Sequence, residues 1–302
     1  MKLKKLRVVQ WIEYAAAMVL VLPFYLLPRS IAFRGGELIG ELLYRVLSRR
    51  RAIGYKNLDI AFGNELSEEE KQRILRSNFR NLGKSLVEVI HFPKMSKNYL
   101  QEKVKIVGQE NYLAAMSKGK GIIYLTAHFG NWEMSSHAQS AAGHPLNVVV
   151  RPLDNQYLDN IVTKLRTMHG NKLLARRKGL KQIISALKNK EAVGILMDQN
   201  TSRSKGIFVD FFGKPACTVP VIGLLVLRYE VPVIPAFIVR SGFDTHTLYL
   251  GPEIDIQRTG DAQKDIAFNT AKFNTIIEDF VRRYPDQWFW IHNRWKNQPL
   301  NN

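Results

Sequence analysis

Residues 126–133, with the sequence TAHFGNWE, place His128 and Glu133 five positions apart, just after an apolar run. A neutral imidazole held by a carboxylate can take a proton from a hydroxyl that attacks a carbonyl, and the carboxylate then stabilises the imidazolium. On one continuous helix, positions five apart point about 140° away from each other, so the two side chains meet only across a turn. Gly130 gives the backbone the freedom for that turn. The pair indicates acyl transfer without an enzyme nucleophile, while a buried histidine paired with an acid for structural reasons fits the spacing equally well.

The elements that must position this pair are a strand before it and a helix after it. Residues 121–125 predict a short buried strand, and Asn131 is a good N-cap for the following helix. Other short apolar runs alternate with helical segments at 104–107, 146–150, 192–197 and 231–239. The alternation predicts an α/β fold in which helices flank a mostly parallel central sheet.

Three polar side chains follow the ends of predicted strands, namely His128, Arg151 and Asp198. Because open sheets of this type bind ligands beyond the carboxyl ends of their strands, we expect one composite site. Arg151 could clamp a phosphate or carboxylate with bidentate hydrogen bonds, or it could form an ion pair with Asp154 or Asp198. For Asp198 the alternative to binding is structural capping of a helix.

A family resemblance strengthens the acyl-transfer hypothesis. His128 and Glu133 match the H-x-x-x-x-[DE] motif of the glycerolipid (lysophospholipid) acyltransferase superfamily, and AHFGNWE resembles the late acyltransferases of lipid A biosynthesis, the lauroyl and myristoyl type. The resemblance runs from the N-terminal segment to the last ten residues, and its further motifs come in order: VVRPLDN, MDQN, FVDFFG and WFWIHNRWK, at 149–155, 197–200, 208–213 and 288–296.

The resemblance implies a glycerolipid acyltransferase-like fold and roles for particular residues. It implies that His128 is the general base and that Glu133 orients it. Substrate binding would involve a further set: Asn131, Arg151, Arg166, Asp198, Phe212 and Gly213. Within this set Arg166 would meet the phosphorylated acceptor, whereas Arg176 and Arg177 fit a solvated surface better.

Phe212 and Gly213 would lie in a loop near the active site and form an apolar wall for an acyl chain, with plain core packing as the alternative. The tryptophans at 288, 290 and 295 fit a bilayer interface and packing under the sheet equally well.

Composition limits the partners and cofactors. With 44 Lys and Arg against 26 Asp and Glu, the net charge of +18 favours an anionic partner, such as acyl carrier protein, a phospholipid surface or nucleic acid. No zinc-finger, RNP or helix-turn-helix pattern supports nucleic acid. No metal-ligand or dinucleotide-binding motif is present, so we expect no metal and no bound cofactor, only acyl carrier protein or coenzyme A thioester as donor. The single cysteine, Cys217, predicts a small buried hydrophobe rather than a disulfide.

The N-terminus predicts a membrane anchor. Residues 14–33 are apolar except for Arg29 and Ser30, and about 20 helical residues match the hydrocarbon thickness of a bilayer. We expect an anchor at 1–35, retained rather than cleaved as a signal peptide, and a catalytic domain at 36–302. That domain would have a helical lead-in, which includes a helix that starts with a capping box at Ser67. Pro23 and Pro28 leave a bent, half-inserted helix as the alternative to a full span. More basic residues follow the apolar segment than precede it, which predicts a catalytic domain on the cytoplasmic side of the membrane. The family resemblance implies that this membrane is the bacterial inner membrane.

The sequence therefore predicts a membrane-associated enzyme that moves a fatty acyl group from acyl carrier protein to a hydroxyl of a phosphorylated glycolipid, a lipid A precursor. Within the class, the alternative is acylation of a lysophospholipid or another glycolipid from acyl-coenzyme A. From a different class, the alternative is a non-catalytic membrane adaptor whose basic face recruits acidic proteins.

Overall fold

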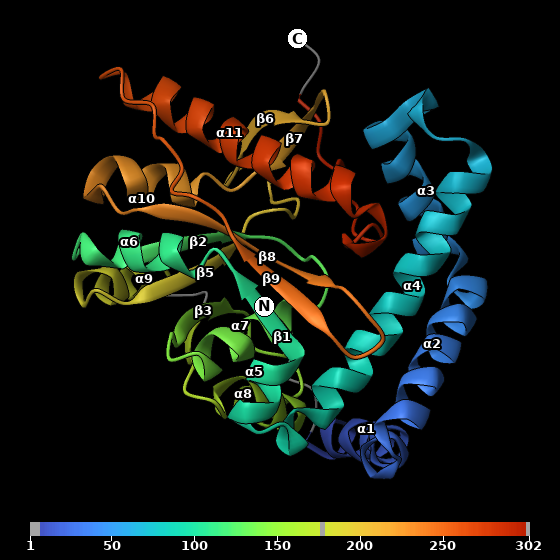
Figure 1. Ribbon diagram of the computed structural model, residues 1–302. Helices are drawn as coiled ribbons and strands as arrows, with labels where there is room; N and C mark the ends of the chain where they lie inside the picture. The colour runs from blue at the N-terminus through green and yellow to red at the C-terminus, as the bar shows by residue number, and fades with distance from the viewer. Residues whose placement is uncertain (1–6, 176–178, 300–302) are drawn as a thin grey trace.

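The computed structural model describes residues 7–175 and 179–299 (Figure 1), so Arg176, Arg177 and the basic residues before Arg7 lie outside it. Within the described ranges the centre of the fold is a seven-stranded sheet. Its strands, in spatial order, are β1 (Val104–Val107), β9 (His246–Leu250), β8 (Val233–Arg240), β2 (Ile122–Thr126), β5 (Ala192–Leu196), β3 (Leu146–Val150) and β4 (Lys172–Ala175). Neighbouring strands pair in parallel except β8 and β9, which pair antiparallel. The predicted α/β fold with a mostly parallel sheet is confirmed.

Helices cover both faces of the sheet. Successive side chains of a strand point to opposite faces, so Ile122 and Tyr124 of β2 pack in one apolar cluster and Ile123 and Leu125 in another. The first cluster includes residues of α5 (Lys97–Lys103), α6 (Gln109–Ser117) and α7 (Trp132–Ala141). The second includes residues of α9 (Gly179–Lys188), α10 (Val221–Tyr229) and α11 (Ala262–Arg283). The remaining crossover helix, α8 (Gln156–Thr167), connects β3 to β4.

The helical lead-in consists of α2 (Arg29–Val46), α3 (Ser48–Phe62) and α4 (Glu68–His91), which stand beside the sheet in Figure 1. As predicted, α4 begins with a capping box, in which Ser67 and Glu70 each bond to the other's backbone N–H. Helices α2 and α4 approach so closely that a Cβ atom on Gly83 would lie 2.0 Å from the carbonyl oxygen of Gly36. Glycine at both positions makes this crossing possible.

The predicted N-terminal apolar helix is present, but it does not extend over 14–33, because the chain forms two helices there. The first, α1 (Arg7–Leu26), is long and apolar enough to cross a membrane by length and composition. Pro28 follows it and α2 begins at Arg29, since proline disfavours helical backbone in the residue before it. The predicted boundary at residue 35 falls inside α2.

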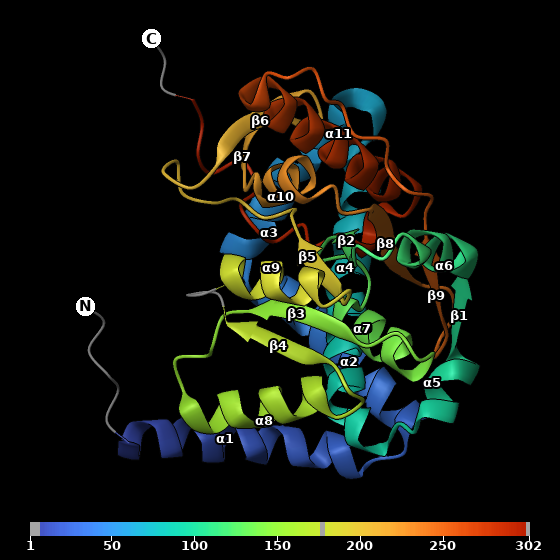
Figure 2. The ribbon, with the colours of Figure 1, turned by 90° about the vertical axis from the view of Figure 1, so that its left-hand side faces the viewer.

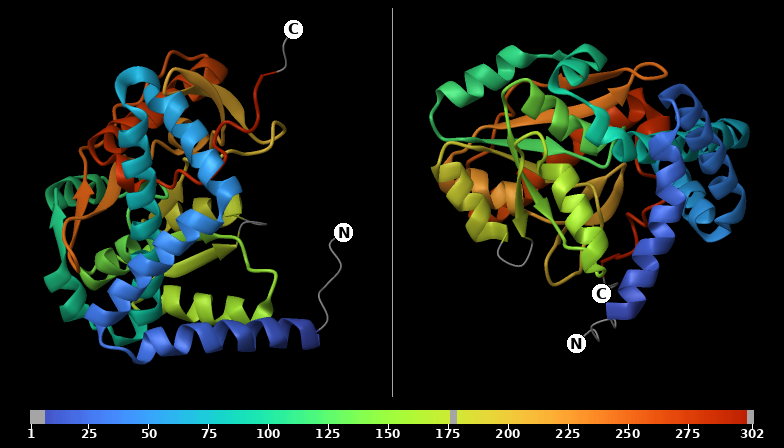
Figure 3. Two further views of the ribbon diagram at one scale, coloured as in Figure 1. Left: turned by 90° about the vertical axis from the view of Figure 1, so that its right-hand side faces the viewer. Right: turned by 90° about the horizontal axis from the view of Figure 1, so that it is seen from below.

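Helix α1 lies along α8 at the base of the molecule (Figures 2 and 3). The side-chain amide of Asn155 donates to the backbone oxygen of Gln10 at 2.7 Å and to the Glu13 carboxylate at 3.1 Å. The outer side of α1 is apolar and exposed, with Trp11 58%, Val19 71% and Leu20 71% accessible.

A two-stranded hairpin of β6 (Ile207–Phe211) and β7 (Lys214–Thr218) lies beside α11. Its turn residues, Phe212 and Gly213, have φ angles of 55° and 68°. Cys217 is buried in β7, as predicted.

The C-terminal tryptophans belong to the core. Trp288, Trp290 and Trp295 are 1%, 0% and 4% exposed, and the ring centroids of Trp288 and Trp290 are 4.7 Å apart. The interpretation that they sit at a bilayer interface is wrong, and packing under the sheet is what the structure shows.

Candidate active site

Strand register brings His128 and Asp198 together. Strands β2 and β5 are parallel neighbours in which Thr126 pairs with Leu196, and each polar residue follows its strand by two positions. The side chains meet at the carboxyl end of the sheet, where Nδ1 of His128 lies 2.8 Å from an oxygen of Asp198. The side chain of His128 is 21% exposed and that of Asp198 only 2%. With Nδ1 bonded, Nε2 is the ring nitrogen that can face a substrate.

The Asp198 carboxylate accepts from three donors. Besides the imidazole, the backbone N–H of His128 donates to it at 3.0 Å and the indole N–H of Trp288 at 2.9 Å. Burial alone would raise the pKa of Asp198, but the neighbouring His128 and these hydrogen bonds outweigh it and lower the pKa. Asp198 therefore stays ionised and fixes the tautomer of His128 with the proton on Nδ1.

The chain between the motif's histidine and glutamate is a tight turn clamped by the C-terminal segment. Gly130 has a φ of 55°, and a Cβ atom there would lie 2.2 Å from the backbone oxygen of Ile238. Gly130 N–H donates to the carbonyl of Gln287 and the N–H of Phe289 donates to the carbonyl of His128. The predicted turn freedom of Gly130 is confirmed, and the C-terminal motif has a structural reason to accompany the histidine motif.

Glu133 and His128 do not pair as the sequence predicted. The carboxylate of Glu133 accepts from the guanidinium of Arg166, at 2.9 Å from Nε and 2.5 Å from Nη2, whereas the imidazole bonds to Asp198. The physical reason is that Glu133 lies in the first turn of α7, where it faces α8, while Asp198 arrives on the strand adjacent to the one before His128. Orientation of His128 is therefore supplied by Asp198, and Arg166 is engaged by Glu133.

Asn131 is the N-cap of α7, as predicted. Its side-chain oxygen accepts from the backbone N–H of Met134 at 3.1 Å, and its amide donates to Glu88 at 2.7 Å. The residue is 2% exposed, so its side chain serves internal contacts.

Arg151 lies at the surface after β3. Its guanidinium is 3.6 Å from the carboxylate of Asp154, and both side chains are about three-fifths exposed, at 61% and 60%. The ion pair with Asp154, one of the predicted alternatives, is present. An exposed pair of this kind contributes about 0–1 kcal/mol, so the arginine can exchange its partner readily.

Phe212 and Gly213 form the hairpin turn between β6 and β7. Phe212 is 6% exposed and packs its ring 5.8 Å from that of Phe62, and its backbone N–H donates to Glu278 at 2.7 Å. These contacts are the core packing that the sequence offered as the alternative to an acyl-chain wall.

An apolar cavity of about 280 Å³ adjoins the Glu133–Arg166 pair. It lies between α4, α7 and α8, and its lining includes Leu82, Leu86, Val89, Trp132, Val162 and Leu165. The ring of Trp132 lies 5.1 Å from that of His128, so this residue connects the imidazole to the cavity. Over the described part of the chain, no group of three or more His, Cys, Asp and Glu side chains could hold a metal ion.

Sequence reasoning missed Trp288 as a donor to Asp198 and missed Asp198 as the partner of His128. His128 and Asp198 each follow an apolar run by two positions. This equal spacing predicts their contact only if β2 and β5 are known to be adjacent strands. Strand order is not readable from local periodicity, because it depends on the crossover connections.

The family model and the similar proteins all point to the same family. Residues 1–297 match the family model of the bacterial lipid A biosynthesis acyltransferases. The chain is 29% identical to a lipid A biosynthesis palmitoleoyltransferase of Escherichia coli (strain K12) over 276 residues, 91% of this chain and 88% of that protein. It is 30% identical to a lipid A biosynthesis acyltransferase of Haemophilus influenzae over 284 residues, 93% and 88% of the two chains. A lipid A biosynthesis myristoyltransferase of E. coli is 26% identical over 246 residues, 81% and 74%. The resemblance seen in the motifs is confirmed, and the chain belongs to the bacterial lipid A biosynthesis acyltransferase family.

Proposed function

We propose that this protein transfers a fatty acyl group from an acyl carrier protein thioester to a hydroxyl of a phosphorylated lipid A precursor, on the cytoplasmic side of a bacterial inner membrane. Family membership supports an acyltransferase that acts on lipid A. It therefore favours an enzyme over the non-catalytic membrane adaptor. The observation that carries the chemistry is the hydrogen bond from His128 Nδ1 to the buried Asp198, with the ring partly exposed.

In this mechanism Nε2 of His128 removes the proton of the acceptor hydroxyl as its oxygen attacks the thioester carbonyl carbon. A carbon–oxygen bond forms, and the carbon–sulfur bond breaks when the tetrahedral intermediate collapses. The imidazolium returns its proton to the departing thiolate, so no group of the enzyme is consumed. Asp198 stabilises the imidazolium between the two proton transfers.

Glu133 still contributes to the proposed site, but it acts on Arg166 and not on His128. Their bidentate contact fixes a guanidinium beside the apolar cavity and close to the imidazole-bearing turn. Charge-assisted hydrogen bonds of this kind contribute about 1.5–3 kcal/mol each. We propose that the pair shapes the site at the point where an acyl chain would enter the cavity.

The predicted substrates suit the remaining features. Arg151 is exposed beyond the same sheet edge, which supports a contact with an anionic acceptor in place of Asp154. An acidic carrier protein complements the net charge of +18. The exposed apolar face of α1 suits contact with a bilayer.

The test is an acyl-transfer assay with purified enzyme in detergent, two donors and two acceptors. We expect transfer from acyl carrier protein thioester to a labelled lipid A precursor. Transfer only to a lysophospholipid would replace the acceptor, and faster transfer from acyl-coenzyme A would replace the donor. Transfer in no combination would refute the proposal.

A further inference from the structure

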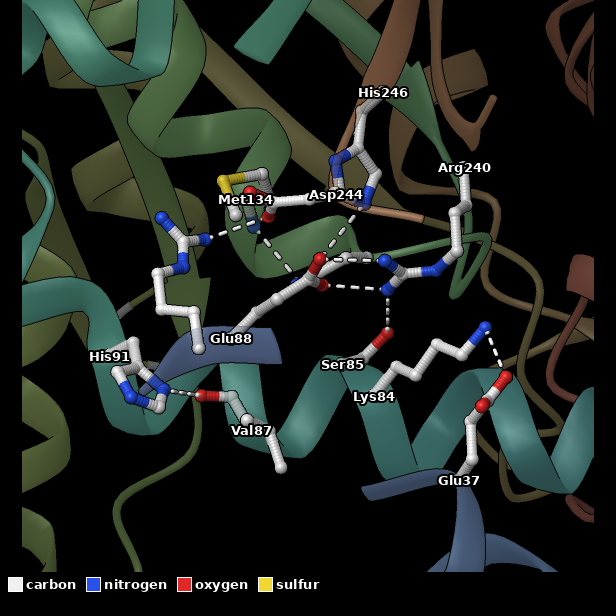
Figure 4. Close-up of polar contacts among 12 residues, drawn as sticks. Glu37, Lys84, Ser85, Val87, Glu88, His91, Met134, Arg240, Asp244 and His246 are labelled. Atoms are coloured by element: carbon white, nitrogen blue, oxygen red, sulfur yellow. Dashed lines mark hydrogen bonds and ion pairs between the residues drawn. The ribbon is translucent and has the colours of Figure 1, made fainter. Parts of the chain in front are cut away.

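The structure contains a buried ion pair that no step of the proposed reaction uses. Glu88 of α4 and Arg240 at the end of β8 face each other in Figure 4, with Ser85 and His246 beside them. We propose that this pair acts as a positioning device: Glu88 holds Asn131, and through Asn131 it sets the geometry of the segment from His128 to Glu133. The inference rests on the proposed function of those two residues.

Glu88 is enclosed by its partners. Its side chain is 0% exposed and that of Arg240 is 6% exposed. The two terminal guanidinium nitrogens of Arg240, Nη1 and Nη2, donate to the two carboxylate oxygens at 2.6 and 2.7 Å. The amide of Asn131 donates to the same carboxylate at 2.7 Å. Burial would raise the pKa of Glu88, but the electrostatic interactions with His246 and Arg240 and the hydrogen bonds from Arg240 and Asn131 outweigh it, and the pKa is lowered.

Asn131 connects this carboxylate to the catalytic segment. Its amide binds Glu88, and its oxygen caps α7 through the backbone N–H of Met134. His128 lies three residues before it and Glu133 two residues after it. A displacement of Asn131 therefore moves the turn that carries the imidazole and the first helical turn that carries the carboxylate.

Arg240 also reaches the other side of the turn. Its backbone N–H donates to the side chain of Gln287 at 2.7 Å, and its carbonyl accepts from the same side chain at 3.1 Å. The backbone carbonyl of Gln287 in turn accepts from Gly130 at 2.8 Å. The turn is thus held by Asn131 on one side and by Gly130 on the other, and both contacts lead back to Arg240.

Stability alone is a poor reason for such a pair. Two charges lose their hydration on burial, and well-packed apolar residues of similar volume often stabilise a fold as well or better. What apolar side chains do not supply is a directed hydrogen bond that gives Asn131 one orientation. The carboxylate of Glu88 and the guanidinium of Arg240 can therefore fix the geometry of the turn between His128 and Glu133.

The experiment exchanges the two groups. In the double variant Glu88→Gln/Asn131→Asp, the hydrogen bond can form in the opposite direction, the total charge is unchanged and Asp remains a good N-cap. Glu88→Gln alone leaves Arg240 without its carboxylate partner. Asn131→Asp alone places two carboxylates together. Asn131→Ser is a milder fourth variant, because serine keeps the cap and loses only the bond to Glu88. The matched control is Glu37→Gln, which breaks the Lys84–Glu37 pair between α4 and α2, also visible in Figure 4, without touching the turn.

Steady-state kcat and KM are measured per folded molecule, well below each melting temperature. We expect kcat of Asn131→Ser to fall about tenfold with KM changed by less than about twofold, and the exchanged pair to recover most of the kcat that each single variant loses. Glu37→Gln should keep the wild-type kcat. Wild-type kcat in folded Asn131→Ser, or an exchanged pair no faster than the single variants, would overturn the inference. An inactive wild type would instead refute the proposed function.

Discussion

The reactivity of His128 depends on which of its two ring nitrogens the protein occupies. Asp198 binds Nδ1 and is itself fixed by the backbone N–H of His128 and by the indole of Trp288. This arrangement leaves Nε2 for the substrate and gives the imidazolium a buried counter-charge. At the scale of residues, the proposed general base is therefore held by a three-residue unit, His128, Asp198 and Trp288, rather than by the histidine motif alone.

Asp198→Asn tests this unit. The amide keeps the size of the side chain but provides only one accepting oxygen for three donors, so His128 loses its fixed tautomer and its counter-charge. We expect kcat to fall by about 10²–10⁴, the range typical of general acid–base catalysis, with the fold retained. Acyl transfer and circular dichroism of the purified variant provide the check. A variant with wild-type kcat would show that Asp198 only supports the fold.

Residue roles were harder to predict from the sequence than residue identities. His128 and Asp198 were both expected at the composite site, because each follows an apolar run. Their pairing was missed because Glu133 is closer in sequence, although the helix that begins after Asn131 directs Glu133 toward α8. Proximity along the chain was a poor guide where two parallel strands place distant residues side by side.

At the scale of elements, the glycine crossing of α2 and α4 should govern how the lead-in packs. A Cβ atom on Gly83 would meet the backbone of Gly36 at 2.0 Å, and backbone cannot move aside as a side chain can. We expect Gly83→Ala to reduce the free energy of unfolding by about 1–3 kcal/mol. Denaturant unfolding in detergent measures this change.

Gly35→Ala in α2, the helix that α4 crosses, is the matched control. There the new Cβ atom would lie 2.7 Å from the ring edge of Phe24, a side chain that can rotate. Alanine also favours a helix over glycine by about 0.5–1 kcal/mol, so little net change is expected. Equal losses in Gly35→Ala and Gly83→Ala would contradict the close-approach explanation.

Elements with strong local signals were predicted, and those with weak ones were not. The runs that became β2 and β5 are short, apolar and almost fully buried, the run of β3 is short and rich in valine, and the capping box of α4 is a direct start signal. The hairpin of β6 and β7 was missed because its turn is Phe212-Gly213, which lacks the usual Asn-Gly or Asp-Gly signature. For the N-terminal segment, Pro28 had offered a bend as the alternative to one continuous helix, and the chain does break there, between α1 and α2.

At the scale of the whole molecule, two buried histidines should make stability depend on pH. Burial lowers the pKa of His137 to about 3 and that of His246 to about 4, from an ordinary value of 6.5. The unfolded chain therefore binds protons that the folded chain does not, and stability falls as pH drops below about 6.5. Each histidine should cost about 2 kcal/mol at pH 5.

Urea unfolding in detergent at pH 7.5 and pH 5 measures this loss, and His137→Gln should remove part of it. Asp198 and Glu88 act in the same direction but only at lower pH, because their lowered pKa values contribute stability that disappears below the ordinary carboxyl range. A wild-type protein equally stable at pH 5 and pH 7.5 would contradict the neutral, buried state of the histidines.

The outer face of α1 should control membrane association of the whole molecule. Val19 and Leu20 are both 71% exposed, so aspartate at these positions leaves the fold intact but opposes insertion, at about 2.5–3.5 kcal/mol per charge in a bilayer core. We expect Val19→Asp/Leu20→Asp to move the protein from the membrane pellet toward the supernatant. Leu113→Asp, exposed to 55% on α6, serves as the control and should stay in the pellet.

The measurement that tests the central claim most directly is single-turnover acyl transfer to the lipid A precursor by wild type and His128→Ala. If the imidazole is the general base, the variant binds both substrates but transfers the acyl group about 10²–10⁴ times more slowly. Transfer by folded His128→Ala at a rate within about tenfold of wild type would show that another group removes the proton, and the site described around His128 and Asp198 would no longer explain the reaction.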